Sequence, residues 1–157
     1  MKLSTKGRYA VRLMLDLTLH QSDKPVLLRE VARRQEISSR YLEQLILNLK
    51  PAGLVKSIRG AKGGFILGRP AEDITLLEIF KASEGSLSIV ECLEDMSFCK
   101  RSKMCVSRDL WLEMKKAMEK ILNRWTLVKL AEQQRRKKVD GQSLLSSKMR
   151  ETGIFSP

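Results

Sequence analysis

The sequence has one histidine, no long apolar run and far fewer acidic than basic side chains. No apolar run approaches the length of about 18 residues that a membrane-spanning helix needs. Charged side chains at Lys6, Arg8, Arg12 and Asp16 interrupt the first twenty residues, which excludes the apolar core of a signal peptide. We therefore expect a cytoplasmic protein without membrane contact. The chain has a single histidine, and no nucleophile stands at a spacing from a base that would indicate catalysis. We therefore predict that the chain is not an enzyme.

The charge balance is strongly basic. The 157 residues include 30 Lys and Arg against 18 Asp and Glu, for a net charge of +12. A hydrophobic fraction of 43% is ordinary for a globular core, so the basic excess lies on the surface. The length suits one compact domain with an appendage. Such a surface indicates an acidic partner, and nucleic acid and anionic membrane are the two common polyanions.

Three helices are predicted in the first third of the chain. Apolar residues of helical spacing predict a helix over Thr5–His20, and a second, short helix follows over Leu28–Gln35. Ser38 and Ser39 are good N-cap residues for a third helix that stops at Lys50. Its apolar stripe comprises Leu42, Leu45, Ile46 and Leu49, and its outward residues include Ser39, Arg40, Glu43, Gln44 and Asn48. The second and third helices match a helix-turn-helix unit, although an ordinary helical hairpin has the same pattern.

A glycine-rich hairpin follows this helix pair. Residues Leu54–Arg59 alternate as a strand, residues 60–64 form a turn, and Phe65–Leu67 return as a second strand. A phosphate-binding enzyme loop would open into a helix rather than a strand. The hairpin lies where a winged helix carries its wing. Arg59 and Lys62 flank the turn, either as contacts to a minor groove and to phosphates or as solvated charges.

Four segments together resemble the IscR-type winged-helix regulator family: LSTKGRYAVRLMLD at 3–16, SRYLEQLILN at 39–48, RGAKGGF at 59–65 and a loop with three cysteines. The resemblance covers roughly residues 1–130. It implies a homodimeric bacterial transcription factor that binds a pseudo-palindromic operator in double-stranded DNA. The expected fold is mainly α with a small β-hairpin: a winged helix-turn-helix DNA-binding domain followed by a long C-terminal dimerisation helix.

The resemblance also indicates which residues contact DNA. Glu43 and Gln44 match base-contacting positions of the family, and Arg59 matches the wing arginine. Glutamine can bridge adenine N6 and N7, and glutamate can accept from cytosine N4. Arg40 departs from the small polar residue of relatives, so it either contacts guanine or pairs with Glu43. The expected DNA-contacting residues are Ser38, Ser39, Arg40, Tyr41, Glu43, Gln44, Arg59 and Lys62.

Three cysteines occur in the second half of the chain. Cys92, Cys99 and Cys105 are separated by six and five residues. An odd number of cysteines without an export signal argues against a disulfide framework. The paired two-residue spacing of structural zinc is absent, so zinc is not favoured. From spacing alone, the three residues are either ligands of one metal or cluster, or reduced thiols of which two can form a disulfide.

The family resemblance favours an iron–sulfur cluster, expected to be 2Fe-2S, with these three cysteines as ligands. The fourth ligand is unknown, because Arg108 occupies the position where relatives place a histidine and Arg8 the position where others place a carboxylate. A guanidinium cannot ligate iron. The candidates that remain are Glu91, Asp95, Asp109, Ser107 and a small molecule. The single histidine, His20, ends the first helix and is expected to be a helix cap or surface residue.

A long helix from about Ser107 to Leu130 is predicted after the cysteines. Six residues spaced alternately by three and four form a heptad seam: Trp111, Met114, Met118, Ile121, Trp125 and Val128. Purely intramolecular packing would satisfy the same pattern. A small winged domain has no obvious place to bury two tryptophans, so we expect the helix to form a dimer.

The expected divisions are a DNA-binding domain at 1–85, a cysteine-bearing sensor loop at 86–107, a dimerisation helix at 108–131 and a basic, disordered tail at 132–157. The predicted function is a dimeric regulator that senses cluster or redox status and controls operator binding, with cluster-biogenesis genes as the family-implied targets. Two alternatives remain. One is a cluster-free regulator of cysteine metabolism or of thiol or nitric-oxide stress, and the other is an accessory protein that binds nucleic acid without sequence preference.

Overall fold

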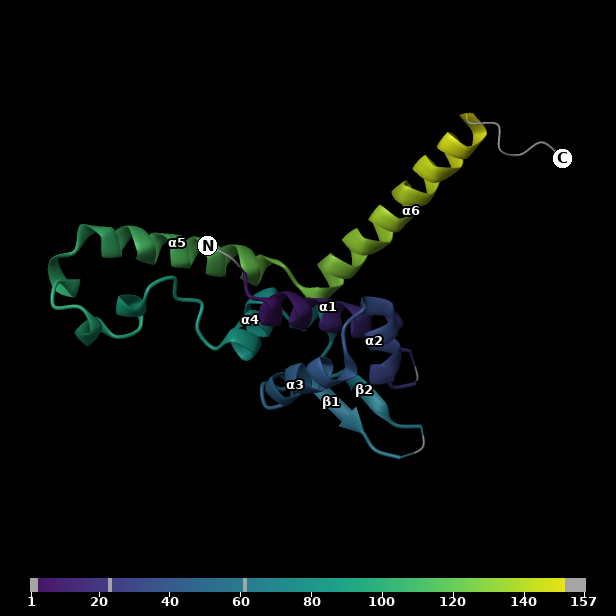
Figure 1. Cartoon of the computed structure of the whole chain (residues 1–157), viewed down its shortest axis with the longest axis horizontal. Helices are drawn as coiled ribbons and strands as arrows, with labels where there is room; N and C mark the ends of the chain where they lie inside the picture. The colour runs from purple at the N-terminus through teal and green to yellow at the C-terminus, as the bar shows by residue number, and fades with distance from the viewer. Residues whose placement is uncertain (1–2, 23, 61, 152–157) are drawn as a thin grey trace.

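The structure is a computed structural model that describes residues 3–22, 24–60 and 62–151. A small winged domain carries two helices that leave it in different directions (Figure 1). The winged domain comprises α1 (Thr5–His20), α2 (Leu28–Gln35), α3 (Ser39–Leu49), β1 (Val55–Ile58), β2 (Gly64–Leu67) and α4 (Leu76–Glu84), with a short 3-10 turn η1 (Ala71–Asp73). Three more 3-10 turns follow, η2 (Glu91–Leu93), η3 (Met96–Phe98) and η4 (Ser102–Met104), and then α5 (Val106–Arg124) and α6 (Leu127–Glu151).

The first three helices confirm the sequence prediction. Ser4 caps α1 by accepting a hydrogen bond from the backbone N–H of Gly7 at 3.2 Å. Ser38 caps α3 by accepting from the N–H of Tyr41 at 3.3 Å. The predicted stripe of α3 is buried in the core at Leu42, Leu45, Ile46 and Leu49. Local signals, caps and apolar spacing, are therefore sufficient to place these helices.

The predicted hairpin is also present. β1 and β2 are antiparallel, with Val55 opposite Leu67 and Ile58 opposite Gly64. Val26, which precedes α2, pairs with Phe65 through two backbone hydrogen bonds of 2.8 and 2.9 Å. Gly60 has a φ of +108°, which favours glycine. These features hold the base of the wing against the helix pair.

Helix α4 has no counterpart in the sequence prediction. Thr75 and Glu78 form a complete capping box at its start, and Gly85 follows its end. Ile79 and Phe80 are buried beneath α1. The Thr-Leu-Leu-Glu sequence at 75–78 was the signal that could have predicted this helix.

The prediction of one uninterrupted helix from about Ser107 to Leu130 is wrong. The backbone is extended at Trp125, with φ −93° and ψ 115°. The Trp125 carbonyl accepts from the N–H of Leu76 at 2.8 Å, and the N–H of Leu127 donates to the Ile74 carbonyl at 3.0 Å. This short antiparallel bridge to the segment before α4 interrupts the helix. Trp125 and Val128 therefore do not continue the seam of α5.

The tail also differs from the prediction, because α6 remains helical through Glu151. Its first turns pack on the winged domain, where Leu127 and Ala131 are buried. The basic block at residues 135–138 is exposed on the part of α6 that extends away from the body (Figure 1). Residues 152–157 of the predicted tail lie outside the described residues.

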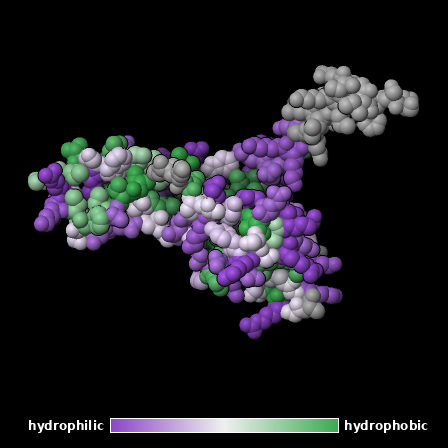
Figure 2. All heavy atoms as spheres, in the orientation of Figure 1, coloured by the Kyte–Doolittle hydropathy of each residue, from purple (hydrophilic) through white to green (hydrophobic). Residues whose placement is uncertain are grey.

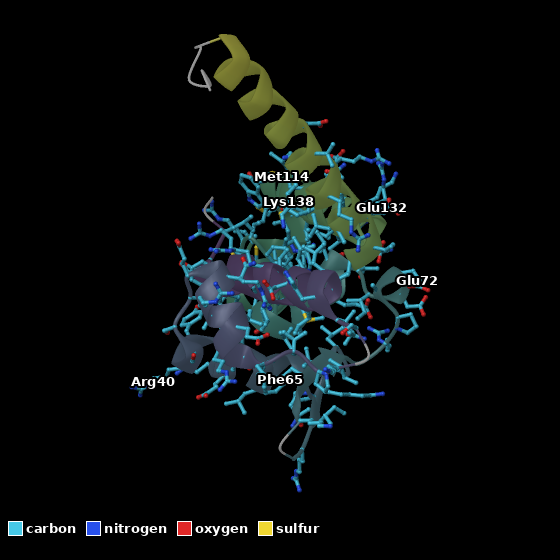
Figure 3. The ribbon with its side chains drawn as sticks, turned by 90° about the vertical axis from the view of Figure 1, so that its right-hand side faces the viewer. Arg40, Phe65, Glu72, Met114, Glu132 and Lys138 are labelled. Carbon is cyan, nitrogen blue, oxygen red and sulfur yellow. The ribbon has the colours of Figure 1, made fainter. Side chains whose placement is uncertain are left out.

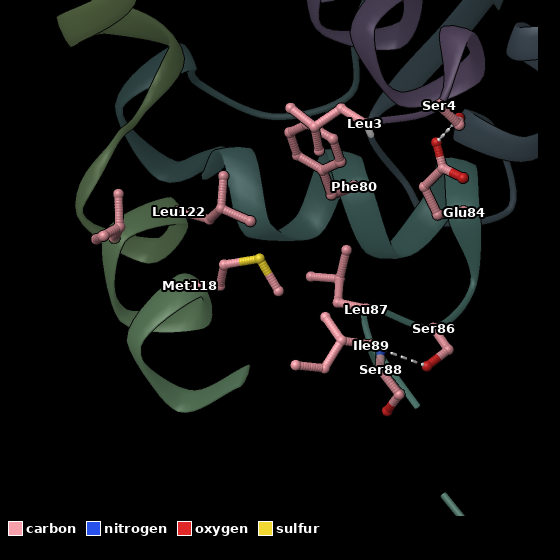
Figure 4. A pocket seen from close by; sticks show the side chains of 11 residues that line it. Leu3, Ser4, Phe80, Glu84, Ser86, Leu87, Ser88, Ile89, Met118 and Leu122 are labelled. Atoms are coloured by element: carbon pink, nitrogen blue, oxygen red, sulfur yellow. Dashed lines mark hydrogen bonds between the residues drawn. The ribbon is translucent and has the colours of Figure 1, made fainter. Parts of the chain in front are cut away.

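An apolar hollow of about 580 Å³ lies where α5 meets the winged domain (Figure 4). Leu3, Phe80, Leu87 and Met118 line it, and Glu84 stands at its edge. The Glu84 carboxylate accepts hydrogen bonds from the Ser4 hydroxyl and, at 2.6 Å, from the Gly7 N–H. The end of α4 thus caps the start of α1.

Candidate nucleic-acid interface and cysteine loop

Helix α3 presents a polar face to solvent. Ser39, Arg40, Glu43 and Gln44 are all exposed, as is the capping residue Ser38. Because the opposite face of the helix is buried, these side chains are held at fixed positions on a rigid element. Such a surface can place hydrogen-bonding groups against base edges in a major groove.

Tyr41 differs from the other predicted contacts of α3. Its ring is half-buried and makes an edge-to-face contact with Tyr9 of α1, with ring centroids 5.7 Å apart. The Arg12 guanidinium lies 5.3 Å from the centroid of the Tyr9 ring. Tyr41 therefore anchors the start of α3 on α1.

Arg40 extends away from the body of the protein (Figure 3). Among the described residues, no ion pair joins Arg40 to Glu43. Of the two roles open for Arg40 from the sequence, this geometry favours contact with an external partner.

The wing projects on the same side of the molecule as Arg40 (Figure 3). Arg59 and Lys62 are exposed near its turn. Lys50, directly after α3, donates a hydrogen bond from Nζ to the Ser57 hydroxyl of β1 at 3.0 Å. The N–H of Leu54 also donates to the Leu49 carbonyl at 3.1 Å. These bonds fix the base of the wing relative to α3.

A buried ionic network sets the position of α2 on α1. Asp16 is fully buried, and its carboxylate accepts hydrogen bonds from the Arg34 guanidinium and, at 2.9 Å, from the Gln35 side-chain amide. Arg12 donates to the Gln35 side chain at 3.1 Å and also to its backbone carbonyl. The hydrogen bond to Asp16 raises the pKa of Arg34 above its ordinary value. His20 lies at the exposed end of α1, as predicted, with Nδ1 2.9 Å from the Asp16 carbonyl oxygen.

A second charged cluster fixes the start of α4. Burial acts to raise the pKa of Glu78, but hydrogen bonds from the Thr75 N–H, from Arg69 and from the Thr75 hydroxyl outweigh it. The pKa of this carboxyl therefore lies below its ordinary value. The ionised form of Glu78 stabilises the capping box.

The cysteine loop, residues 86–107, lies at the far end of α5 from α3 and the wing (Figure 1). Cys92 and Cys105 are half-buried, and Cys99 is exposed. Cys92 and Cys99 line one hollow of about 730 Å³ together with Phe98. Cys105 instead stands at the N-cap position of α5.

The placement of the three thiols does not form a metal site. Among the described residues, no three His, Cys, Asp or Glu side chains are grouped so that they could hold a metal ion. Three thiolates are the ligand type that iron–sulfur clusters use, so the donor chemistry fits a cluster, although Cys105 stands apart from the hollow that Cys92 and Cys99 share. Of the fourth-ligand candidates, Asp95 is engaged with the Ser97 N–H and hydroxyl, both at 2.8 Å. These bonds hold the pKa of Asp95 below its ordinary value.

Arg108 connects the two ends of the cysteine loop. Its Nε donates a hydrogen bond to the Cys92 carbonyl at 3.1 Å, which links the first turn of α5 to the start of the loop. Lys115, two turns along α5, donates to the Ser88 hydroxyl at 2.9 Å. Both contacts tie the orientation of α5 to the conformation of the loop.

One face of α5 is apolar and exposed. Within residues 106–124, no side chain is buried, and Val106, Leu110 and Ile121 are 81%, 52% and 55% exposed. Apolar side chains gather along this helix, whereas the winged domain is largely hydrophilic on the face shown (Figure 2). None of the described helices is long and apolar enough to cross a membrane.

A capped helix with an exposed polar face, a buried partner helix and a basic hairpin fixed beside it define a winged helix-turn-helix DNA-binding protein. Residues 3–133 match the family model described as "Rrf2: Iron-dependent Transcriptional regulator". The chain belongs to the Rrf2 family of transcriptional regulators, which bind DNA and are not enzymes.

Known relatives span most of the chain. It is 43% identical to Protein rrf2 of Nitratidesulfovibrio vulgaris over 130 residues, which covers 83% of this chain and 87% of the relative. The structure of IscR from T. potens has 41% identity and a TM-score of 0.70, covering 85% of this chain and 88% of that one. The structure of CymR, the global cysteine regulator of B. subtilis, has 41% identity and a TM-score of 0.69, covering 84% and 97%.

Proposed function

We propose that this regulator is a homodimer that binds a pseudo-palindromic operator, and that the state of the cysteine loop sets its affinity. The observation that carries the proposal is the exposed polar face of α3, held rigidly beside a basic wing on the same side of the molecule. In this assignment residues 1–85 bind DNA, and residues 86–107 form the sensor.

Each of the predicted contact residues has a proposed role in the operator complex. Gln44 bridges adenine, Glu43 accepts from cytosine and Arg40 contacts guanine in the major groove. Arg59 enters the minor groove, and Lys62 contacts phosphate. Ser38 and Ser39, at the start of α3, lie where a phosphate is attracted to a helix N-terminus, and the Tyr41 hydroxyl contacts the backbone beside them.

The apolar face of α5 supports the proposed dimer. Val106, Leu110, Met114 and Ile121 recur at helical spacing and are all exposed in the single chain. A second copy of α5 would bury them, and a two-fold axis would present two α3 helices to two half-sites. Because α5 packs on α4 and α6 packs on α1, the dimer contact connects to both winged domains.

The cysteine loop is proposed to hold an iron–sulfur cluster of the 2Fe-2S type through Cys92, Cys99 and Cys105. The description of the family as iron-dependent supports this assignment. When bound, the cluster would supply a redox-sensitive link between the three thiolates. The loop would have to draw Cys105 toward Cys92 and Cys99, and the fourth ligand would come from Glu91, Asp95, Asp109, Ser107 or a small molecule.

Movement of Cys105 would shift the start of α5 directly, because Cys105 is the N-cap residue of that helix. The Arg108 contact to the Cys92 carbonyl would have to change at the same time. A change in the orientation of α5 would alter the relation of the two wings and hence the operator affinity.

Anaerobic reconstitution with iron and sulfide tests the assignment. The protein should gain visible charge-transfer absorption, bind stoichiometric iron and change its operator affinity. The triple variant Cys92→Ala, Cys99→Ala, Cys105→Ala should do none of these, whereas Lys62→Ala should still bind iron. A wild-type protein that stays colourless, with unchanged operator binding, would refute cluster sensing.

A second candidate is a cluster-free thiol switch, favoured by the shared hollow of Cys92 and Cys99. Hydrogen peroxide could oxidise both thiols to one disulfide; the two thiols give up two electrons and two protons, which reduce the peroxide to two water molecules. The similarity to the global cysteine regulator supports this alternative, with cysteine metabolism as the regulated process. Iron analysis of protein purified without oxygen, and mass spectrometry of the same protein after peroxide treatment, separate the two. The third alternative, a non-specific accessory protein, predicts equal affinity for operator and scrambled DNA.

A further inference from the structure

Helix α3 carries one large apolar side chain on its solvent side. Leu47 is 71% exposed, whereas Leu42, Leu45 and Leu49 of the same helix are at most 1% exposed. Leu47 therefore contributes nothing comparable to the core. It lies outside the apolar stripe that the sequence predicts for α3, although it stands among other apolar residues in the chain.

The helical geometry places Leu47 at the centre of the polar face. At about 100° per residue, Leu47 projects about 40° from Glu43 and about 60° from Gln44, between the two. Arg40 projects in the same angular interval, two turns earlier. The three polar side chains and Leu47 thus form one continuous surface along the helix, which is the surface proposed to enter the major groove.

The major groove offers one apolar group to such a side chain. Each base pair presents hydrogen-bond donors and acceptors there, and thymine adds its C5-methyl group. A leucine flanked by Glu43 and Gln44 cannot satisfy a donor or acceptor, but it can bury a methyl group. The polar neighbours on both sides argue against a protein partner, since they would be desolvated in an apolar interface.

We infer that Leu47 contacts the C5-methyl group of a thymine in each operator half-site. This inference rests on the proposed role of α3 in reading DNA. It adds one base preference to those assigned to Arg40, Glu43 and Gln44. Leu47 thereby acts as a specificity-determining residue.

Replacement of thymine by deoxyuridine tests the inference, because it removes the methyl group and leaves every hydrogen-bonding group in place. The operator is first selected from genomic fragments by the wild-type protein. Each thymine is then replaced in turn, and affinity is measured by fluorescence anisotropy. Burial of one methyl group corresponds to about a fourfold change in affinity, so we expect about a fourfold loss at one position of each half-site.

Two variants identify the residue responsible. Leu47→Ala should bind the thymine and deoxyuridine operators equally. Lys62→Ala should bind both more weakly and retain the fourfold ratio. Because Leu47 is exposed, its replacement should leave the fold intact, which circular dichroism checks.

The experiment distinguishes a failure of the Leu47 inference from a failure of the proposed function. A wild-type protein that prefers its operator but ignores every deoxyuridine replacement would overturn the role of Leu47 and leave the proposed function standing. A Leu47→Ala protein that keeps the thymine preference would assign it to another residue and also overturn the inference. Equal affinity for operator and scrambled DNA would remove both the inference and the proposed function.

Discussion

Asp16 of α1 accepts a bidentate contact from Arg34 of α2, with distances of 3.1 Å from Nε to Oδ2 and 2.6 Å from Nη2 to Oδ1. The carboxylate is fully buried, and the Arg34 side chain is 21% exposed. This contact sets the orientation of α2 on α1, and α3, the helix proposed to read DNA, packs on α2. Gln35 donates to the same carboxylate and completes its hydrogen bonding.

Replacement of Asp16 by Asn should destabilise the protein by about 3 kcal/mol, because it leaves the Arg34 guanidinium without its buried counter-charge. Urea denaturation monitored by circular dichroism measures the loss. The Arg33→Gln variant, which removes an exposed positive charge one residue away, serves as the control and should change stability by less than about 0.5 kcal/mol. Equal stability of the Asp16→Asn and wild-type proteins would contradict the structural role of the ion pair.

The contribution of Glu78 to stability should depend on pH. Its folded-state pKa lies below the ordinary value of 4.5, so ionised Glu78 stabilises the fold above about pH 4.5. That contribution is lost as the pH falls through the lowered pKa. The Glu78→Gln variant should be less stable than wild type by about 0.5–1 kcal/mol at pH 7, since solvent screens the exposed Arg69 pair.

The difference between the two proteins should narrow as the pH falls, because wild-type Glu78 becomes protonated and comes to resemble glutamine. Urea denaturation between pH 7 and pH 3 measures it. Glu72→Gln removes an exposed carboxylate from the neighbouring turn and controls for net charge. A stability difference that stays constant across this range would show that the charge of Glu78 is irrelevant.

Replacement of Gly7 by Ala should be destabilising, although alanine favours helix by about 1 kcal/mol over glycine. A Cβ at this position would lie 2.6 Å from both Glu84 Oε1 and Phe80 Cε1. We expect a net loss of about 1–3 kcal/mol, measured as a lower urea midpoint. Lys6→Ala, on the same turn of α1, is the matched control. A Gly7→Ala protein as stable as wild type would mean that α1 and α4 are less closely packed than described.

The residues proposed to contact DNA should fall into two classes. Gln44→Ala should reduce discrimination at one base pair of each half-site by about 1–3 kcal/mol. Lys62→Ala should weaken operator and scrambled DNA alike and reduce the salt dependence of binding. Binding titrations on operator variants at several salt concentrations distinguish these effects. A uniform loss on all sequences for Gln44→Ala would place that residue against phosphate instead.

The sequence predicts those parts of the fold that depend on local signals. The helices containing Leu13 and Leu45 and the turn at Gly60 follow from apolar spacing, caps and turn residues. The break at Trp125 could not be predicted, because neither glycine nor proline marks it and its cause is pairing with Ile74 and Leu76, fifty residues away.

The candidate DNA-binding surface and the cysteine loop also combine features that the sequence predicts with features that depend on tertiary packing. The polar residues of α3 were predictable from the pattern and the family resemblance, and the structure presents them on one exposed face. The burial of Asp16 was not predictable, because it depends on which neighbouring helix covers that position. The cysteines were predictable as a set, but their separation into a Cys92 and Cys99 hollow and an isolated Cys105 depends on the conformation of the loop.

The central claim is that the cysteine loop controls sequence-specific DNA binding. The most direct measurement is the affinity ratio of operator to scrambled DNA, for protein reconstituted anaerobically with iron and sulfide and for untreated protein. We predict a preference of about a thousandfold or more in the tighter-binding state. Between the two states, operator affinity should change by about fivefold to 150-fold, and this change should be absent from the triple Cys→Ala variant. The same operator affinity in both states of the wild-type protein would contradict the account.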